Sequence, residues 1–173
     1  MIIRRLIRPL AGLALAGLLA LGCSRDVSHG DSRWLDNASS RHALADEQLA
    51  SGNVPAARDT LLSIVHGRAP ADISADERRV VLQDTYFRLA KLDLDAGDAR
   101  GALANTDHGL GLGRADDVFV ANLLVVRGAA HEALGAGPAA VEDYHEALVI
   151  NDRLLAQTLA GKPGATPSPG ATP

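Results

Sequence analysis

One pattern constrains the fold of this chain more than any other: an amphipathic segment, a glycine and a second amphipathic segment, repeated three times. The glycines that separate the paired segments are Gly52, Gly97 and Gly135. Glycine ends helices readily because it adopts the left-handed backbone conformation without a steric penalty. A few residues after each glycine stands a small side chain that lets two helices approach closely: Ala57, Ala102 and Ala140. The pattern predicts three helical hairpins, over residues 38–66, 83–113 and 121–152.

The composition favours helices over strands in the predicted domain, which extends from residue 32 to residue 160. Apolar residues make up 47% of the chain but aromatic residues only 3%, whereas strands prefer β-branched and aromatic side chains. Apolar residues at helical spacing also predict which side chains the helices bury. The candidates are Leu44, Leu49, Leu61, Leu89, Leu124, Leu134, Ala147, Leu148 and Ile150. We therefore expect an all-α fold.

The three segments resemble the tetratricopeptide repeat family. The third segment matches the family's pattern best, through Gly128, Gly135, Ala140, Tyr144 and Ala147. The second keeps Leu89, Ala90, Gly97 and Ala102. The first keeps Leu44, Ala45, Gly52 and Ala57. The resemblance implies a right-handed superhelical stack of three hairpins, and because the last amphipathic segment continues past residue 152 to Leu159, we expect a C-terminal capping extension.

In that family, the first helix of each repeat lines a concave groove that binds a partner protein. Transferred by position, the resemblance nominates nine groove residues: His42, Asp46, Leu49, Phe87, Lys91, Asp95, Asn122, Val125 and Glu132. An extended or helical peptide would lie there through aliphatic contacts and charge complementarity. The alternative is that some of these side chains pack internally and that the groove is unused. The family's carboxylate clamp for C-terminal peptides is not expected, because its positions hold His42, Asp46 and Val126.

The first 22 residues have the composition of a secretory signal. Three arginines precede an uncharged apolar run over residues 10–21, which is short for a transmembrane span. The run ends in Leu19-Ala20-Leu21-Gly22-Cys23, which resembles the lipobox of bacterial lipoproteins. The resemblance implies cleavage before Cys23 and acylation of that cysteine, and several acyl chains give durable anchoring. The alternatives are an uncut signal anchor and a free thiol after ordinary cleavage.

The segments that flank the predicted domain have compositions of their own. Residues 23–31 would form the lipidated N-terminus and a polar tether. By resemblance, Ser24 favours the outer membrane, facing the periplasm, because inner-membrane retention usually shows aspartate after the cysteine. Residues 161–173 contain mainly Gly, Pro, Ala, Thr and Ser, and a segment of this composition cannot bury enough apolar surface to fold. We therefore expect a disordered C-terminal tail.

Several kinds of chemistry find no support in the sequence. Without the three arginines of the leader, 14 basic residues stand against 21 acidic ones and form no basic stripe, so no nucleic-acid partner is expected. The six histidines show no metal-ligand spacing, and the aspartates of residues 93–98 lack the glutamate that a calcium loop needs at its twelfth position. No catalytic or nucleotide-binding motif occurs. We expect no metal, no cofactor, no small-molecule substrate and no enzymatic activity.

The leading hypothesis is therefore a membrane-anchored adaptor or scaffold of the bacterial envelope that binds another envelope protein in its groove. The alternative is a self-associating structural lipoprotein without a peptide ligand. In that case the contact would involve apolar residues at the open end of the stack, namely Leu154, Leu155 and Leu159.

Overall fold

A computed structural model describes residues 29–160, and within this range the chain forms six α-helices and no strand. In chain order these are α1 (His29–Ala50), α2 (Val54–Val65), α3 (Ala75–Asp95), α4 (Ala99–Gly111), α5 (Val118–Ala133) and α6 (Gly137–Ala160). The prediction of an all-α fold is confirmed for this part of the chain. The predicted leader, Cys23 and the predicted tail lie outside the described residues.

Helix α1 begins at His29, three residues before the domain boundary expected at residue 32. A short polar stretch gives no periodic signal that separates a tether from the first turn of a helix. The end of α6 at Ala160 coincides with the expected boundary of the domain.

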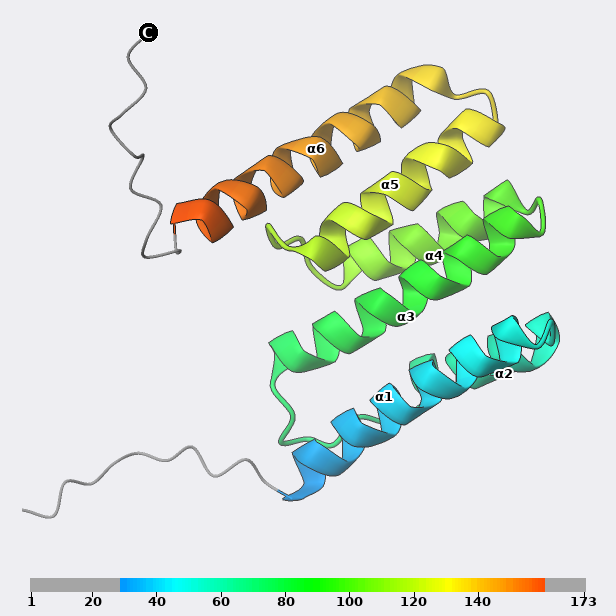
Figure 1. Cartoon of the computed structure of the whole chain (residues 1–173), viewed down its shortest axis with the longest axis vertical. Coiled ribbons are helices and arrows are strands. Elements are labelled where there is room, and N and C mark those ends of the chain that lie inside the picture. The colour runs from blue at the N-terminus through cyan, green and yellow to red at the C-terminus, as the bar shows by residue number, and fades with distance from the viewer. Residues whose placement is uncertain (1–28, 161–173) are drawn as a thin grey trace, which may run out of the picture.

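The six helices pair in chain order into three antiparallel hairpins, α1 with α2, α3 with α4 and α5 with α6 (Figure 1). Each hairpin turns at one of the three glycines, with a φ angle of 78° at Gly52, 78° at Gly97 and 76° at Gly135. The N–H of the residue after each glycine donates to the carbonyl five residues earlier, at 2.8 Å in all three turns. In this Schellman arrangement the turn satisfies a carbonyl that the ending helix leaves free.

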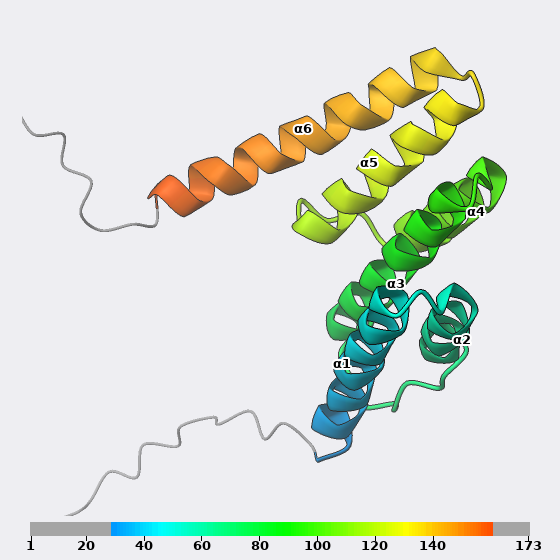
Figure 2. The same ribbon diagram turned by 45° about the vertical axis from the view of Figure 1, so that its right-hand side comes forward.

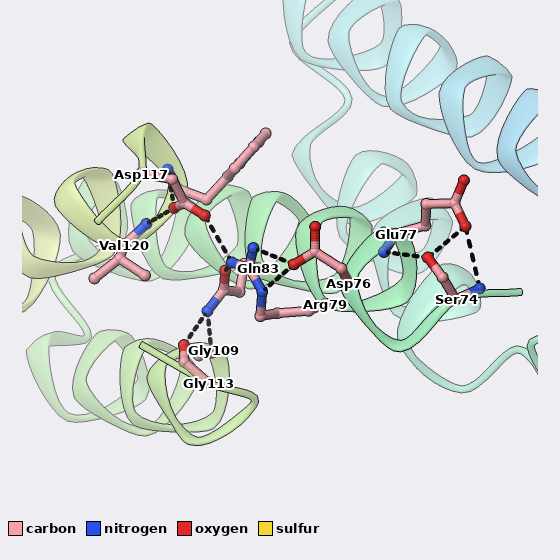
Figure 3. Close-up of polar contacts among 10 residues, drawn as sticks. Ser74, Asp76, Glu77, Arg79, Gln83, Gly109, Gly113, Asp117 and Val120 are labelled. Carbon is pink, nitrogen blue, oxygen red and sulfur yellow. Dashed lines mark hydrogen bonds and ion pairs between the residues drawn. The ribbon is translucent and has the colours of Figure 1, made fainter. Parts of the chain in front are cut away.

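Helix α3 begins eight residues before residue 83, where the repeat pattern placed the start of the second hairpin. Ser74 caps this helix: its Oγ accepts from the Glu77 N–H at 3.1 Å, and Glu77 Oε2 accepts from the Ser74 N–H at 3.1 Å (Figure 3). This capping box starts the helix directly after the loop that contains Pro70. The capping box thus adds two turns to α3 at its N-terminal end.

A polar network built on these two turns joins α3 to α4 and α5 (Figure 3). Arg79 Nη1 donates to Gln83 Oε1 at 2.6 Å and to Asp117 Oδ2 at 2.8 Å. The buried Gln83 donates through Nε2 to the carbonyls of Gly109 at 3.1 Å and Gly113 at 2.7 Å. Asp117 in turn accepts from the first backbone N–H groups of α5. The network therefore satisfies carbonyls where α4 ends and fixes where α5 begins.

Small residues occupy the closest contacts between paired helices. The alanines predicted at these contacts are buried, as is a fourth in α6: Ala57, Ala102, Ala140 and Ala147. Gly128 of α5 lies under the ring of Tyr144 of α6, and a Cβ at this position would stand 2.7 Å from the ring. Close packing of this kind explains how a chain with few aromatic residues builds a dense core.

The buried-face prediction is correct at most positions and wrong at three. Leu61, Leu89, Leu124, Ala147 and Ile150 are buried, and Leu49 is partly buried. By contrast, the exposed residues include Leu44, Leu134 and Leu148. In α1 and α6 the buried positions are held by the adjacent alanines, Ala45 after Leu44 and Ala147 before Leu148. A small side chain there allows the partner helix to come closer. Leu134 is the C-cap of α5 at the hairpin turn and is 44% exposed.

Candidate binding groove

The first helices of the three hairpins lie along one side of the molecule, with α3 between α1 and α5 (Figures 1 and 2). Two adjoining pockets open on these helices. The larger, of about 630 Å³, lies between α1, α3 and the start of α2, and the smaller, of about 330 Å³, lies between α3 and α5. Phe87, Lys91 and Asp95 of α3 line both pockets. We call the two pockets together the groove.

The larger pocket lies beside the smallest interhelix contact of the fold, where α1 meets α3. This contact is polar. His42 Nε2 lies 2.9 Å from Thr85 Oγ1, and Arg88 Nη1 donates to Asp46 Oδ1 at 2.6 Å. Beyond Asp46 the two helices leave room between them, and Leu61 and other apolar side chains line the space.

The groove combines apolar walls with a charged rim. In the larger pocket the walls include Leu49, Val54, Leu61, Phe87 and Leu92. In the smaller pocket they include Leu94, Val125, Val126 and Ala129. The charged side chains that line the larger pocket are Asp46, Arg88, Lys91 and Asp95. An apolar surface with a few polar groups is typical of sites that bind a ligand in a defined orientation.

Two of these charges have no partner within the part of the chain that the structure describes. Lys91 and Asp95 stand one turn apart on α3, both are exposed, and neither forms an ion pair with another residue in the range 29–160. Arg88, by contrast, pairs with Asp46 and with Asp84. Lys91 and Asp95 can therefore pair with charges on a ligand without breaking an existing ion pair.

The structure places seven of the nine nominated residues in the pockets: Asp46, Leu49, Phe87, Lys91, Asp95, Asn122 and Val125. The remaining two, His42 and Glu132, line neither pocket. His42 lies at the contact between α1 and α3, where its Nδ1 is 3.3 Å from Asp84. Glu132 accepts a hydrogen bond from the Tyr144 hydroxyl at 3.1 Å. Both side chains bind neighbouring side chains instead of lining a pocket. The position of a residue along its own helix does not reveal such contacts.

Several lining residues were not identified from the sequence. They include Val54, Arg88, Leu92, Leu94 and Ala129. Val54 is informative because it opens α2, directly after the capping residue Asn53, yet it is apolar and 42% exposed. An apolar residue in an exposed first turn is a signal that could have indicated a binding surface. The other residues lie next to nominated positions. A wider lining face on each first helix than the one transferred from the family would have included them.

The chemistry of His42 supports a structural role for this residue. Burial lowers its pKa, Asp84 opposes that effect and Arg88 adds to it. Thr85 Oγ1 donates its proton to the Val81 carbonyl at 2.7 Å, so it accepts the hydrogen bond from His42 Nε2–H. The Thr85 contact therefore requires a proton on Nε2, while Nδ1 lies 3.3 Å from Asp84 Oδ2, and through these two contacts His42 connects α1 to α3.

Buried carboxylates elsewhere in the described residues form ion pairs between helices. Asp93 of α3 binds Arg58 of α2 and accepts from Asn105 of α4 at 2.6 Å. Asp143 of α6 binds Arg127 of α5. Across residues 29–160, no three His, Cys, Asp or Glu side chains are grouped in a way that would hold a metal ion. None of the six described helices has both the length and the apolarity that a membrane span requires.

Comparisons with known proteins do not assign the chain to a family. No family model matches it, and neither a curated protein nor a solved structure is significantly similar to it. The function is therefore inferred from the residues of the groove and from their geometry.

Proposed function

We propose that the chain is an adaptor that binds a peptide segment of a partner protein in the groove. The observation that carries this proposal is the pair of adjoining pockets on α1, α3 and α5, which share Phe87, Lys91 and Asp95. A peptide can place side chains in both pockets because the pockets adjoin, and apolar contacts with a few charge pairs are the usual basis of such recognition.

The proposed architecture is a right-handed superhelical stack of tetratricopeptide-like hairpins, with the end of α6 as a capping extension. Three features support it: glycine turns with positive φ in every hairpin, buried alanines at the predicted close contacts, and Gly128 under the Tyr144 ring. In a stack of this kind the first helix of each hairpin lines the concave side. That placement agrees with a groove on α1, α3 and α5.

The shape of the groove favours a peptide with a bulky apolar side chain and a smaller one nearby. The larger pocket, of about 630 Å³, would take the bulky side chain, and the smaller pocket, lined by Val125 and Ala129, would take the other. Lys91 and Asp95 would pair with charges of opposite sign on the backbone termini or side chains of the peptide. Mixed charge at this point would help to fix the direction in which the peptide lies.

The adaptor is proposed to act in the bacterial envelope, anchored by acylation of Cys23. The lipobox-like sequence Leu19–Cys23 supports this anchor, and Ser24 favours the outer membrane with the domain facing the periplasm. Its partners would be envelope proteins. The acidic charge of the mature chain and the absence of catalytic motifs from the sequence favour protein binding over nucleic-acid binding or catalysis.

Site-specific photocrosslinking in intact cells tests the adaptor. A photoreactive phenylalanine analogue replaces Phe87 in the groove, and the same analogue replaces the exposed Arg100 of α4 as the control. We expect a defined envelope protein to be crosslinked from position 87 and not from position 100. Adding Val125→Asp, which places a charge in an exposed apolar position of the smaller pocket, should abolish the crosslink. Equal crosslinking from both positions, or none from position 87, would contradict the proposal.

A further inference from the structure

The outer face of α6 carries apolar side chains that the fold leaves uncovered. Within the described residues, α6 packs against α5 and against no other helix, and it forms one edge of the molecule (Figure 1). Its four exposed aliphatic residues, which we call the α6 stripe, are Val141, Leu148, Leu155 and Leu159. Each is between 57% and 68% exposed. Exposed apolar surface that gathers on one face marks an interaction site.

The spacing of the α6 stripe is that of a helix that pairs with another helix. Successive members are seven, seven and four residues apart, which places them on one face. The exposed His145 and Asp152 lie on one flank of this face, each four residues after a member of the stripe. The face that packs on α5 is a different one, formed by Ala140, Asp143, Ala147 and Ile150.

We propose that the α6 stripe docks against α6 of a second copy of this chain, in antiparallel orientation. Three of its four members are arranged symmetrically about Leu148, since Val141 precedes it and Leu155 follows it by seven residues. In an antiparallel pair related by a two-fold axis, Leu148 meets Leu148 of the second copy. Val141 then meets Leu155 of the second copy, and the reverse. A self-complementary surface of this kind closes into a dimer.

The flanking charges select the antiparallel orientation. In the antiparallel pair, the same flank of both helices meets, so His145 lies beside Asp152 of the second copy. The two-fold axis generates this pair twice, and each pair joins an imidazole with a carboxylate. In a parallel pair, the two-fold axis would run along the helices and put these flanks on opposite sides of the interface, so His145 and Asp152 would not meet. The charge pattern therefore fits a second copy of the same helix.

Neither the segment after α6 nor the groove competes for this surface. Residues 161–173 contain no Leu, Ile, Val, Met or aromatic side chain that could cover the α6 stripe by apolar contact. The groove uses α1, α2, α3 and α5, so docking through α6 leaves both pockets open. The dimer and the proposed peptide binding are therefore independent, and either can fail without the other.

Disulfide crosslinking of the full chain in its membrane tests the dimer. Leu148→Cys, Val141→Cys and Leu155→Cys are made singly, and the parent chain, whose only cysteine is Cys23, is the control. We expect Leu148→Cys to form a covalent dimer, because the two copies of residue 148 face each other within the roughly 7 Å that a disulfide spans between Cα atoms. Residues 141 and 155 lie about 10 Å along the helix from the centre, and so about 20 Å from their own copies.

Those two single variants should therefore form no dimer above the parent, whereas the double variant Val141→Cys/Leu155→Cys should form one. Absence of a dimer from Leu148→Cys would overturn the inference and would assign the α6 stripe to another occupant, such as lipid or a different protein. Equal dimer from all three single variants would also overturn it, because that result indicates parallel pairing or random collision.

An exchange of the side chains at positions 145 and 152 tests the antiparallel orientation, with Leu148→Cys as the only added cysteine. Asp152→Lys, introduced into the Leu148→Cys chain, should reduce the covalent dimer, because the introduced ammonium group would stand beside His145 of the second copy. Adding His145→Glu should restore the dimer. Both positions are exposed, so the helical circular dichroism of the variants should match that of the parent. A dimer yield that ignores Asp152→Lys would overturn the antiparallel register.

Discussion

Removal of the Asp143 carboxylate tests how much a buried ion pair contributes to the third hairpin. The Asp143 side chain, on α6, is 5% exposed. Arg127 of α5 donates to it through Nε at 3.1 Å and through Nη2 at 2.5 Å. Arg127 also contacts Asp107 of α4 at 3.3 Å. In the Asp143→Ala variant the guanidinium would keep Asp107 as its only carboxylate partner, in a position that is largely shielded from water.

The size of the effect follows from how far the pair is removed from solvent. Removing one partner of a buried ion pair costs about 3–5 kcal/mol. The Arg127 side chain is 19% exposed and retains Asp107, so we expect a loss near the lower end, about 3 kcal/mol. The matched control is Glu146→Ala on the same helix. Glu146 pairs with Arg114 at 2.6 Å, but both side chains are more than 40% exposed, and such a pair contributes about 0–1 kcal/mol.

Urea unfolding followed by the helical circular dichroism signal measures both changes. Asp143→Ala should lower the free energy of unfolding by about 3 kcal/mol and Glu146→Ala by less than about 1 kcal/mol. The double variant Arg127→Met/Asp143→Leu should recover most of the loss, because apolar residues of similar volume remove the unpaired charge. Equal losses in the two single variants would refute the reasoning, since both ion pairs are short and differ chiefly in burial.

Three further predictions concern single residues. Gly135→Ala should lower the free energy of unfolding by about 1 kcal/mol. The φ of 76° strains an L-residue by roughly 1–2 kcal/mol, and the lower conformational entropy of the unfolded alanine variant offsets part of this strain. The control is Gly137→Ala, where an added Cβ meets no neighbour and the free energy of unfolding should not fall. Burial lowers the pKa of His42, so the folded state favours the neutral imidazole and the free energy of unfolding falls as the pH drops below about 6.5. The urea midpoints at high and low pH should therefore differ less in His42→Gln than in the parent. An unchanged difference between the two midpoints would refute this. Cys23→Ala should move the chain from the membrane fraction to the soluble fraction, and retention on membranes would contradict acylation.

The hairpin turns could be predicted from the sequence because they are local. The hydrogen bond that closes each turn spans five residues, and the positive φ falls on the glycine itself. The network that joins α3 to α4 and α5 is different. Arg79 binds Asp117, 38 residues further along, and Gln83 binds Gly113, 30 residues further along. No spacing rule connects such residues, so this network became visible only in the structure.

The groove could be predicted in part, because a position along a helix indicates which face a residue shares but not which neighbours compete for its side chain. Phe87 lines the pockets as expected, while Thr85 engages His42 and the Tyr144 hydroxyl engages Glu132. The same limit explains the exposed Leu148. Periodicity alone could not decide whether Leu148 or a neighbouring alanine would face α5.

The buried amide of Gln83 has a consequence for the order in which the helices unfold. Its hydrogen bonds make the end of α4 depend on α3, and its neighbour Arg79 links α3 to the start of α5 through Asp117. These three helices should therefore open together, and their amide protons should exchange last. Helix α1 has a smaller contact with α3, which includes the hydrogen bond between His42 and Thr85, and we expect local opening there to require less free energy. In the larger pocket the wall formed by α3 is therefore held in place, whereas the wall formed by α1 can move. This difference would let the pocket adapt to side chains of different size.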